Sequence, residues 1–231
     1  MVRRISDPFV SFTDLKKRAM KIAILKERRP HETRVAATPE TVKKLKALGA
    51  EEIVIEAGAG TAAAYTDDAY AEAGATIVPD AAAAVAAADI VFKIQRPMSA
   101  AEGIDEISLL RTGQTLMSPL GALNNRELVE ALATRGVTSF ALELIPRITR
   151  AQSMDILSSQ ANLAGYKAVL AAADNFGRIF PQMMTPGGTL APARAFIMGV
   201  GVAGLQAIAT ARRLGAIVTA TDVRPATKEQ V

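Results

Sequence analysis

One glycine-rich stretch limits the possible folds more than any other part of the chain. Residues 196–224 read FIMGVGVAGLQAIATARRLGAIVTATDVR and contain the spacing G-x-G-x-x-G. A short apolar run, residues 195–198, precedes the glycines, and an apolar helical pattern, residues 203–214, follows them. A strand, a tight turn and a helix in this order are typical of the start of a dinucleotide-binding domain.

Each glycine of this turn has its own physical reason. Gly199 permits the tight turn, Gly201 lets the backbone approach a pyrophosphate, and Gly204 lets the helix pack against the strand. The free N–H groups at the helix start, on Val202, Ala203 and Gly204, are expected to face the phosphates. A glycine-rich turn without any ligand is the alternative interpretation.

An acidic residue follows the next predicted strand, residues 217–221. Asp222 lies 18 residues after Gly204, where a carboxylate should accept hydrogen bonds from an adenosine ribose. Its neighbours Val223 and Arg224 are expected to contact the same cofactor. A nearby Arg can accept the 2′-phosphate of NADP, but the carboxylate would repel that phosphate. We therefore predict NAD(H).

The rest of the chain alternates predicted strands with predicted helices. The strands are residues 21–25, 53–56, 75–78, 89–94, 114–118 and 137–142, and the helices are residues 39–48, 67–73, 80–88 and 125–135. Alternation with short turns indicates a parallel, doubly wound sheet. A longer helix, about 154–175, would span about 33 Å and could bridge two domains. The predicted fold class is α/β, with two Rossmann-like doubly wound domains joined by this helix and the second domain incomplete.

We place the domain boundary near Pro146. Residues 21–146 form the predicted N-terminal domain, and residues 147–231 begin the nucleotide-binding domain. The stretch FPQMMTPGGTLAP, residues 180–192, is interpreted as a loop because it is rich in Pro and Gly. Residues 1–19 are polar without clear periodicity, and we interpret them as a tail or as the product of a misassigned start.

Composition excludes several classes of function. There is no Cys and only one His, His31, so a cysteine metal site, a disulfide framework and thiol chemistry are excluded, and we predict no metal. The net charge is +4, but residues 1–19 hold five Lys or Arg against two Asp. The body of the chain therefore lacks the basic face that nucleic-acid binding requires. The sequence contains no uninterrupted stretch of about 18 apolar residues, so we predict no membrane span.

Four segments carry a resemblance to a known family. They are KERRPHETRVAATPE, EAGAG at 56–60, RAQSMDILSSQANLAGYKAV at 150–169 and GVGVAGLQAIATARRLGA at 199–216. From Met20 onward the chain resembles the NAD(H)-binding domain of the α subunit of proton-translocating NAD(P) transhydrogenase. It is more distantly similar to alanine dehydrogenase. The motif RAQSMDILSSQ favours the transhydrogenase side.

The resemblance implies a set of nicotinamide contacts, because in that family this loop folds over the nicotinamide end of NAD(H). The residues implied around the nicotinamide and its ribose, or along the cofactor, are Arg147, Ile148, Thr149, Gln152, Asp155 and Ser158. Gln152 and Asp155 are the candidate catalytic residues, although hydride transfer needs orientation more than acid–base help. The alternative is that Gln152, Asp155 and Ser158 form only a polar loop and helix cap.

Alanine dehydrogenases need further residues, of which this chain keeps only some. Arg34 matches the family's substrate-binding Arg, but Gln95 stands at the Lys position and Gly121 at the His position. Gly cannot move a proton, and a neutral Gln cannot pair with a carboxylate. We therefore expect a dismantled amino-acid site, with Arg34 paired to a local acid. His31 is expected to be a surface-loop residue.

The resemblance also implies a larger assembly. This chain would pass hydride between NADH and NADP⁺, with NADP(H) on a partner domain and proton translocation in membrane-spanning subunits. It would form a homodimer on the cytoplasmic face of the inner membrane. The alternatives are a soluble alanine dehydrogenase-like oxidoreductase and a non-catalytic NAD-binding module. Because the family's nucleotide domain continues for several more strands, we expect residues 1–231 to be a fragment that is inactive alone and binds NADH weakly or not at all.

Overall fold

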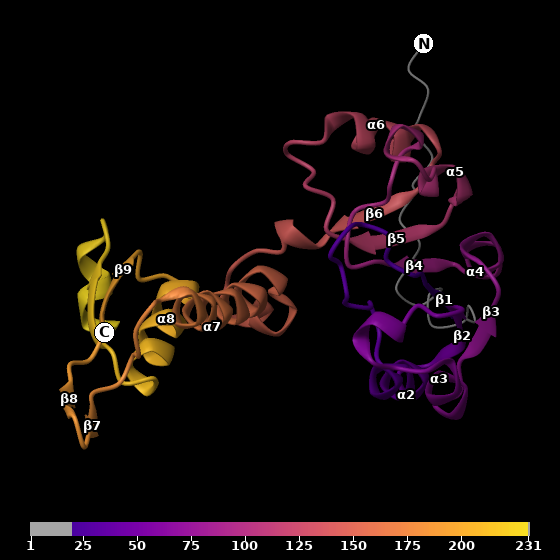
Figure 1. Ribbon diagram of the computed structural model, residues 1–231. Coiled ribbons are helices and arrows are strands. Elements are labelled where there is room, and N and C mark those ends of the chain that lie inside the picture. The colour runs from indigo at the N-terminus through magenta and orange to yellow at the C-terminus, as the bar shows by residue number, and fades with distance from the viewer. Residues whose placement is uncertain (1–19, 231) are drawn as a thin grey trace, which may run out of the picture. The chain divides into compact units, whose positions relative to one another are not determined.

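The computed structural model describes residues 20–230, so the predicted tail at residues 1–19 lies outside the described residues. The chain divides into two compact units, the first reaching to Leu144 and the second beginning at Ile145. The predicted boundary at Pro146 lies next to this division. Figure 1 traces the first unit from indigo to magenta and the second from orange to yellow.

The first unit is built on a six-stranded parallel sheet. Its strands are β1 (Met20–Ile24), β2 (Ala50–Glu56), β3 (Thr76–Val78), β4 (Ile90–Phe92), β5 (Thr115–Ser118) and β6 (Thr138–Ala141), and its helices are α2 (Pro39–Ala47), α3 (Asp67–Glu72), α4 (Ala81–Ala87), α5 (Glu106–Leu109) and α6 (Arg126–Thr134). The strand order is β3-β2-β1-β4-β5-β6, and every pair is parallel. This is the doubly wound order, whose direction reverses between β1 and β4. The predicted α/β class is confirmed.

Local capping signals set the helix bounds of this unit. The Thr38 hydroxyl accepts a hydrogen bond from the Thr41 N–H at 3.2 Å, and Pro39 occupies the first turn of α2. The Asp80 carboxylate accepts from the Ala83 N–H at 2.8 Å at the start of α4. Side chains of this kind satisfy N–H groups that a helix start leaves without partners. The predicted starts of both helices therefore hold to within a residue.

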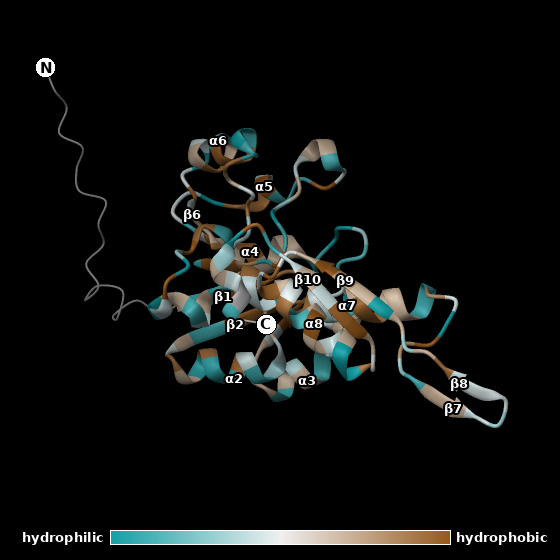
Figure 2. Cartoon of the chain, turned by 90° about the vertical axis from the view of Figure 1, so that its left-hand side faces the viewer, coloured by the Kyte–Doolittle hydropathy of each residue, from teal (hydrophilic) through white to brown (hydrophobic). Residues whose placement is uncertain are grey.

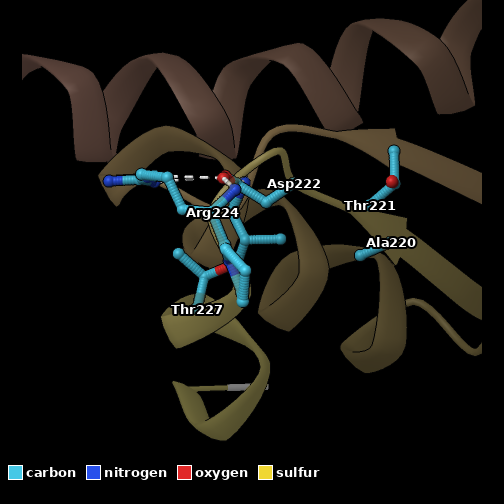
Figure 3. A pocket seen from close by; sticks show the side chains of 7 residues that line it. Ala220, Thr221, Asp222, Arg224 and Thr227 are labelled. Atoms are coloured by element: carbon cyan, nitrogen blue, oxygen red, sulfur yellow. Dashed lines mark hydrogen bonds and ion pairs between the residues drawn. The ribbon is translucent and has the colours of Figure 1, made fainter.

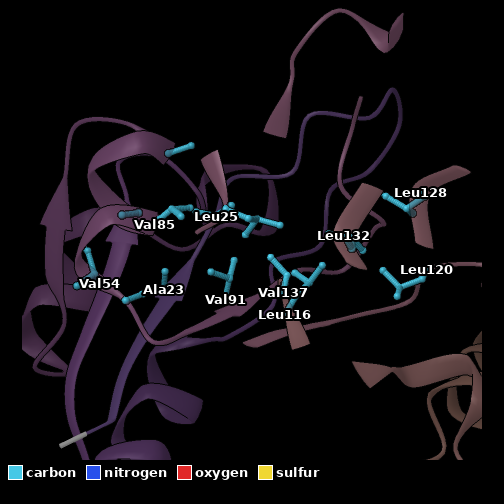
Figure 4. Close-up of a cluster of buried hydrophobic side chains, with 14 residues drawn as sticks. Ala23, Leu25, Val54, Val85, Val91, Leu116, Leu120, Leu128, Leu132 and Val137 are labelled. Atoms are coloured by element: carbon cyan, nitrogen blue, oxygen red, sulfur yellow. The ribbon is translucent and has the colours of Figure 1, made fainter. Parts of the chain in front are cut away.

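The sheet carries a hydrophobic core on each face. Alternate residues of β1 divide between them: Ala23 packs with α4 and α6, whereas Ile22 and Ile24 pack on the side of α2 and α3. Figure 4 shows the first of these clusters, with side chains from strands and helices meeting across the sheet face. Hydrophilic residues run along α2 and α3 in Figure 2. A parallel sheet covered on both faces explains the continuous apolar runs at residues 22–24, 53–55 and 90–92 of its central strands.

The second unit contains a βαβ element and a long helix. Its elements are a 3-10 helix (Thr149–Met154), α7 (Ile156–Asn175), β7 (Met183–Thr185), β8 (Gly188–Leu190), β9 (Arg194–Met198), α8 (Val202–Arg213), β10 (Ile217–Thr221) and a 3-10 helix (Pro225–Gln230). β9 and β10 pair in parallel, and α8 makes the crossover between them. Helix α7 lies in this unit and packs on α8, so its predicted role as a link stays a prediction. Between residues 20 and 230, no helix combines the length and apolar character needed to cross a membrane.

One sequence prediction in this unit is wrong. The stretch at residues 180–192, predicted to be a loop, contains an antiparallel hairpin of β7 and β8, with Thr185 opposite Gly188. Gly188 closes the turn at φ +124°, a conformation that other residues rarely adopt. All six strand residues are exposed, so burial leaves no alternating pattern in the sequence. Two of the Pro and Gly residues that suggested a loop, Pro186 and Gly187, form the turn of this hairpin.

Candidate functional site

The glycine turn joins β9 to α8, as the sequence predicted. Gly199 has φ +96°, in the region that favours glycine. A methyl group on Gly204 would lie 1.8 Å from the Gly199 carbonyl oxygen, so the helix can approach the turn only with glycine at this position. A methyl group on Gly201 would meet only the Arg224 Nη2 atom, at 4.0 Å. The backbone at Gly201 is therefore open to a close ligand.

The start of α8 has the properties of an anion site. Gly201 is the N-cap residue and supplies no side-chain hydrogen bond, and the first turn carries no acidic residue. The N–H groups of Val202, Ala203 and Gly204 therefore lack a capping side chain, and the helix dipole places partial positive charge there. A phosphate group fits this chemistry.

Asp222 lies beside this turn, at the end of β10. Its Oδ2 atom accepts a hydrogen bond from the Val200 N–H at 2.7 Å, and Oδ1 accepts one from the Arg224 N–H at 2.8 Å. The Arg224 guanidinium donates to both carboxylate oxygens, at 3.0 and 3.1 Å (Figure 3). The Arg224 side chain and the two N–H groups hold the pKa of Asp222 well below its usual range. Asp222 is therefore a fixed, ionised acceptor directly beside the glycine turn.

A cavity of about 600 Å³ opens at this carboxylate. Asp222 and Arg224 line it together with Val200, Thr221 and Thr227. The sequence reasoning missed Thr227, whose hydroxyl donates to the Arg224 carbonyl at 2.8 Å, because no motif extends past the acidic residue. Val223, a predicted contact, is 98 % exposed and is not among the residues that line the cavity.

A second group of predicted residues meets at the start of α7. Asp155 caps the helix: its Oδ1 atom accepts from the Ser158 N–H at 2.9 Å, and its Oδ2 atom accepts from the Ser158 hydroxyl at 2.7 Å. Arg147 donates from Nη2 to the Ser158 hydroxyl at 3.2 Å, and its Nε atom lies 3.6 Å from Asp155 Oδ2. Ser158, and to a lesser extent Arg147, lowers the pKa of Asp155. We call these three residues the Arg147–Asp155–Ser158 cluster.

The other predicted residues of this loop are exposed. Ile148 and Thr149 lie at the start of the 3-10 helix, and Gln152 lies within it. The Gln152 side chain takes no part in the hydrogen bonds of the cluster. The structure thus brings three of the six loop residues into contact and leaves the other three at the surface.

In the first unit, Arg34 is paired with a local acid, as predicted. Glu32 accepts from Arg34 Nε at 2.8 Å and from Arg34 Nη2 at 2.7 Å, and Gln95 Nε2 donates to the same carboxylate at 2.6 Å. The Arg34 hydrogen bonds lower the pKa of Glu32 to about 2. Gly121 has φ +60°, and a methyl group there would lie 2.5 Å from Asn125 Nδ2. His31 is exposed in a loop, also as predicted.

Buried charges occupy the point where the strand order of the first sheet reverses. Lys93 Nζ lies 3.0 Å from Glu106 Oε1 and 3.3 Å from Glu27 Oε2, and all three side chains are 2 % exposed. Burial raises the pKa of Glu27. Open α/β sheets bind ligands at this point in many proteins. Sequence reasoning missed this group, for which a Lys directly after an apolar strand was the available signal.

Comparison with known families decides the relationship. Residues 23–164 match the model described as "Alanine dehydrogenase/PNT, N-terminal domain", and residues 168–231 match "Alanine dehydrogenase/PNT, C-terminal domain". The chain belongs to the alanine dehydrogenase/PNT family.

Within the family, the similarity is greater on the transhydrogenase side. The chain is 64 % identical over 212 residues to an NAD(P) transhydrogenase α-subunit chain of Rhodospirillum rubrum, covering 92 % of this chain and 55 % of the relative. It is 33 % identical over 210 residues to an alanine dehydrogenase of Halomonas elongata, covering 88 % and 53 %. The crystal structure of transhydrogenase from Sinorhizobium meliloti matches with a TM-score of 0.86 at 53 % identity, over 91 % of this chain and 61 % of that one. The chain spans about half the length of the curated relatives it matches.

Proposed function

We propose that the second unit binds NAD(H) and that the protein is the NAD(H)-binding component of an NAD(P) transhydrogenase. Such an enzyme passes hydride between NADH and NADP⁺. The single observation that carries the proposal is the Asp222 carboxylate fixed on the Val200 N–H, directly beside the G-x-G-x-x-G turn. The 64 % identity to a transhydrogenase α subunit supports the choice of enzyme.

The phosphate turn and Asp222 would hold the adenosine half of the cofactor. The first-turn N–H groups of α8 would bind the pyrophosphate. The Val200 and Arg224 N–H groups keep the Asp222 carboxylate in place, whereas the Arg224 side chain is 61 % exposed. The guanidinium is the solvent-exposed partner of this ion pair, so it can swing away and leave the carboxylate to a ribose diol.

The Arg147–Asp155–Ser158 cluster and Gln152 would hold the nicotinamide half. The nicotinamide ring, when bound, supplies the hydride. The protein's contribution is orientation: Arg147 can donate to an amide oxygen, and Gln152 can both donate and accept. Because Gln152 has no partner in the cluster, its amide is available for a ligand. Asp155 combines this role with that of a helix cap, and its capping bonds fix its carboxylate.

The proposal extends to the assembly. NADP(H) would be held by a partner domain, and membrane-spanning transhydrogenase subunits would couple hydride transfer to proton translocation. The chain would act as a homodimer at the cytoplasmic face of the inner membrane, held there by its partner subunits. The family relationship alone supports these statements.

An alanine dehydrogenase activity is the less supported candidate. Such an enzyme must hold the carboxylate of a keto or imino acid and deliver a proton to its keto or imino group. Here Glu32 pairs with Arg34 and Gln95, the two residues at the predicted substrate positions. Gly121, at the position expected for a His, has no side chain and is crowded by Asn125. These contacts favour transhydrogenation over alanine oxidation.

The Asp222→Asn variant tests the proposed NAD(H) site. Asparagine keeps one oxygen but loses the charge, so we expect NADH binding by the complete native protein to weaken about tenfold, as a lost charged hydrogen bond would produce. The variant would also no longer repel the 2′-phosphate of NADPH, so the ratio of the affinities for NADH and NADPH should decrease. Titration with each nucleotide measures both effects.

Asp174→Asn is the matched control, since Asp174 is an exposed carboxylate of α7 in the same unit. It should bind NADH like the unaltered protein. An unchanged NADH affinity in Asp222→Asn would show that Asp222 does not contribute to the proposed NAD(H) site. Failure of the unaltered complete protein to bind NADH would end the proposal.

A further inference from the structure

Gly165 lies in the middle of α7 at a very close approach to α8. A methyl group built on Gly165 would lie 2.1 Å from the Ala203 carbonyl oxygen, 2.9 Å from the Ala203 carbonyl carbon and 3.0 Å from its Cα atom. All three are backbone atoms and cannot move aside as a flexible side chain could. Gly165 has no positive φ, so the position requires glycine for space and not for backbone conformation.

Glycine has a local disadvantage at this position. In a helix interior it is less favourable than alanine by about 1 kcal/mol. Neighbouring positions of α7 on both sides are alanine-rich, in the run ANLAGYKAVLAAA. Glycine thus lowers the local stability of α7 at the residue that faces Ala203. In return it allows the backbones of α7 and α8 to approach closely.

Ala203 belongs to the first turn of α8, whose N–H groups form the proposed phosphate site. That turn is held by the sheet, because Gly204 packs on the Gly199 carbonyl and α8 packs on both β9 and β10. Further along the same interface, Val169 of α7 packs with Ala207 and Ala211 of α8. Gly165 and Val169 are four residues apart, as are Ala203 and Ala207, so one row of each helix forms the contact.

Helix α7 also carries the Arg147–Asp155–Ser158 cluster at its start. Asp155 lies ten residues before Gly165, about 15 Å along the helix axis. A helix of this length moves as a stiff rod, so its contact at Gly165 determines where its first turn lies relative to α8. The hydrogen bonds of the cluster do not reach the phosphate turn, which leaves the helix contact to set the distance between them.

We propose that Gly165 is a positioning residue that sets the spacing between the phosphate turn and the Arg147–Asp155–Ser158 cluster, and so the length of dinucleotide that the second unit can hold. The inference rests on the proposed function, because it assigns the two ends of the spacing to the two halves of NAD(H). An added methyl group would push α7 outward, since α8 is held by the sheet. The adenosine half would keep its contacts, and the nicotinamide half would lose its own.

The test compares two ligands in the complete native protein. ADP contains the adenosine and the pyrophosphate, whereas NADH adds the nicotinamide and its ribose. For Gly165→Ala we expect NADH binding to weaken at least tenfold and ADP binding to stay within twofold. Gly177→Ala is the control, because a methyl group there would have no atom within 4 Å, and it should leave both ligands unaffected.

A second variant applies if Gly165→Ala does not fold. Val169→Leu adds a methylene group to the same row of contacts and should cause a smaller loss that is again selective for NADH. Equal weakening of ADP and NADH in a folded variant, or no change in either, overturns the inference. If the unaltered protein binds NADH no more tightly than ADP, the proposed function fails instead. The two failures are thereby distinguished.

Discussion

At the scale of single residues, Glu32 shows how a side chain of the protein can occupy the polar groups at a possible amino-acid substrate position. Its carboxylate accepts hydrogen bonds from Arg34 and from Gln95, and its side chain is 7 % exposed. The sequence could predict that Arg34 pairs with an acid, because Glu32 lies only two positions before it. It could not identify Gln95 as the second donor, since that contact joins residues 63 positions apart.

The Glu32 contacts predict a pH dependence of stability. The pKa of Glu32 falls from the usual 4.5 to about 2 in the folded chain. A lowered pKa means that the ionised group stabilises the fold above pH 4.5 and that this contribution is lost as the pH falls towards 2. Glu32→Gln should therefore flatten the fall in stability over this range.

Urea unfolding of the complete native protein at a series of pH values measures this effect. Glu72→Gln, on the exposed surface of α3, is the matched control and should keep the original slope. A Glu32→Gln variant that loses stability between pH 4.5 and 2 as steeply as the unaltered protein would show that the Arg34 and Gln95 contacts do not stabilise the ionised form.

At the scale of elements, the sequence predicts those regions whose signals are local. Thr38 and Asp80 mark helix starts because a cap acts within three residues, and Gly204 marks the α8 turn because its contact with Gly199 is also local. The β7–β8 hairpin has no such signal, since its exposed strands show no alternation. Only the turn residues distinguish it from a loop, and Pro-Gly-Gly is compatible with both.

The hairpin turn provides a prediction of its own. Gly188 at φ +124° lies in a region that costs other residues about 1–3 kcal/mol. Gly188→Ala should therefore loosen β7 and β8, with amide hydrogen exchange in the hairpin at least about fivefold faster. Gly187→Ala is the control, because Gly187 has no positive φ and its methyl group would meet only Thr185 Oγ1, at 3.8 Å. Equal exchange in both variants would mean that the turn does not hold the hairpin.

At the scale of the whole molecule, alternating strands and helices were enough to predict a parallel, doubly wound first sheet. The alternation follows from the need to cover both faces of such a sheet. The buried Lys93–Glu27–Glu106 group could not be predicted, because it forms only when β1, β4 and α5 come together. For the same reason, no local pattern indicates that Gly165 lies against Ala203, 38 residues further along the chain.

The central claim is that this chain serves transhydrogenation, and one assay addresses it directly. Membranes containing the complete native complex are supplied with NADH and NADP⁺, and separately with alanine and NAD⁺. We expect hydride transfer between the nucleotides, no alanine-dependent reduction of NAD⁺, and at least about tenfold slower transfer in Gln152→Ala and Asp155→Asn, since both variants disturb the orientation of the nicotinamide. Asparagine retains the capping oxygen at position 155, so α7 should stay folded. Robust alanine oxidation, or transhydrogenation that neither variant slows, would contradict the account.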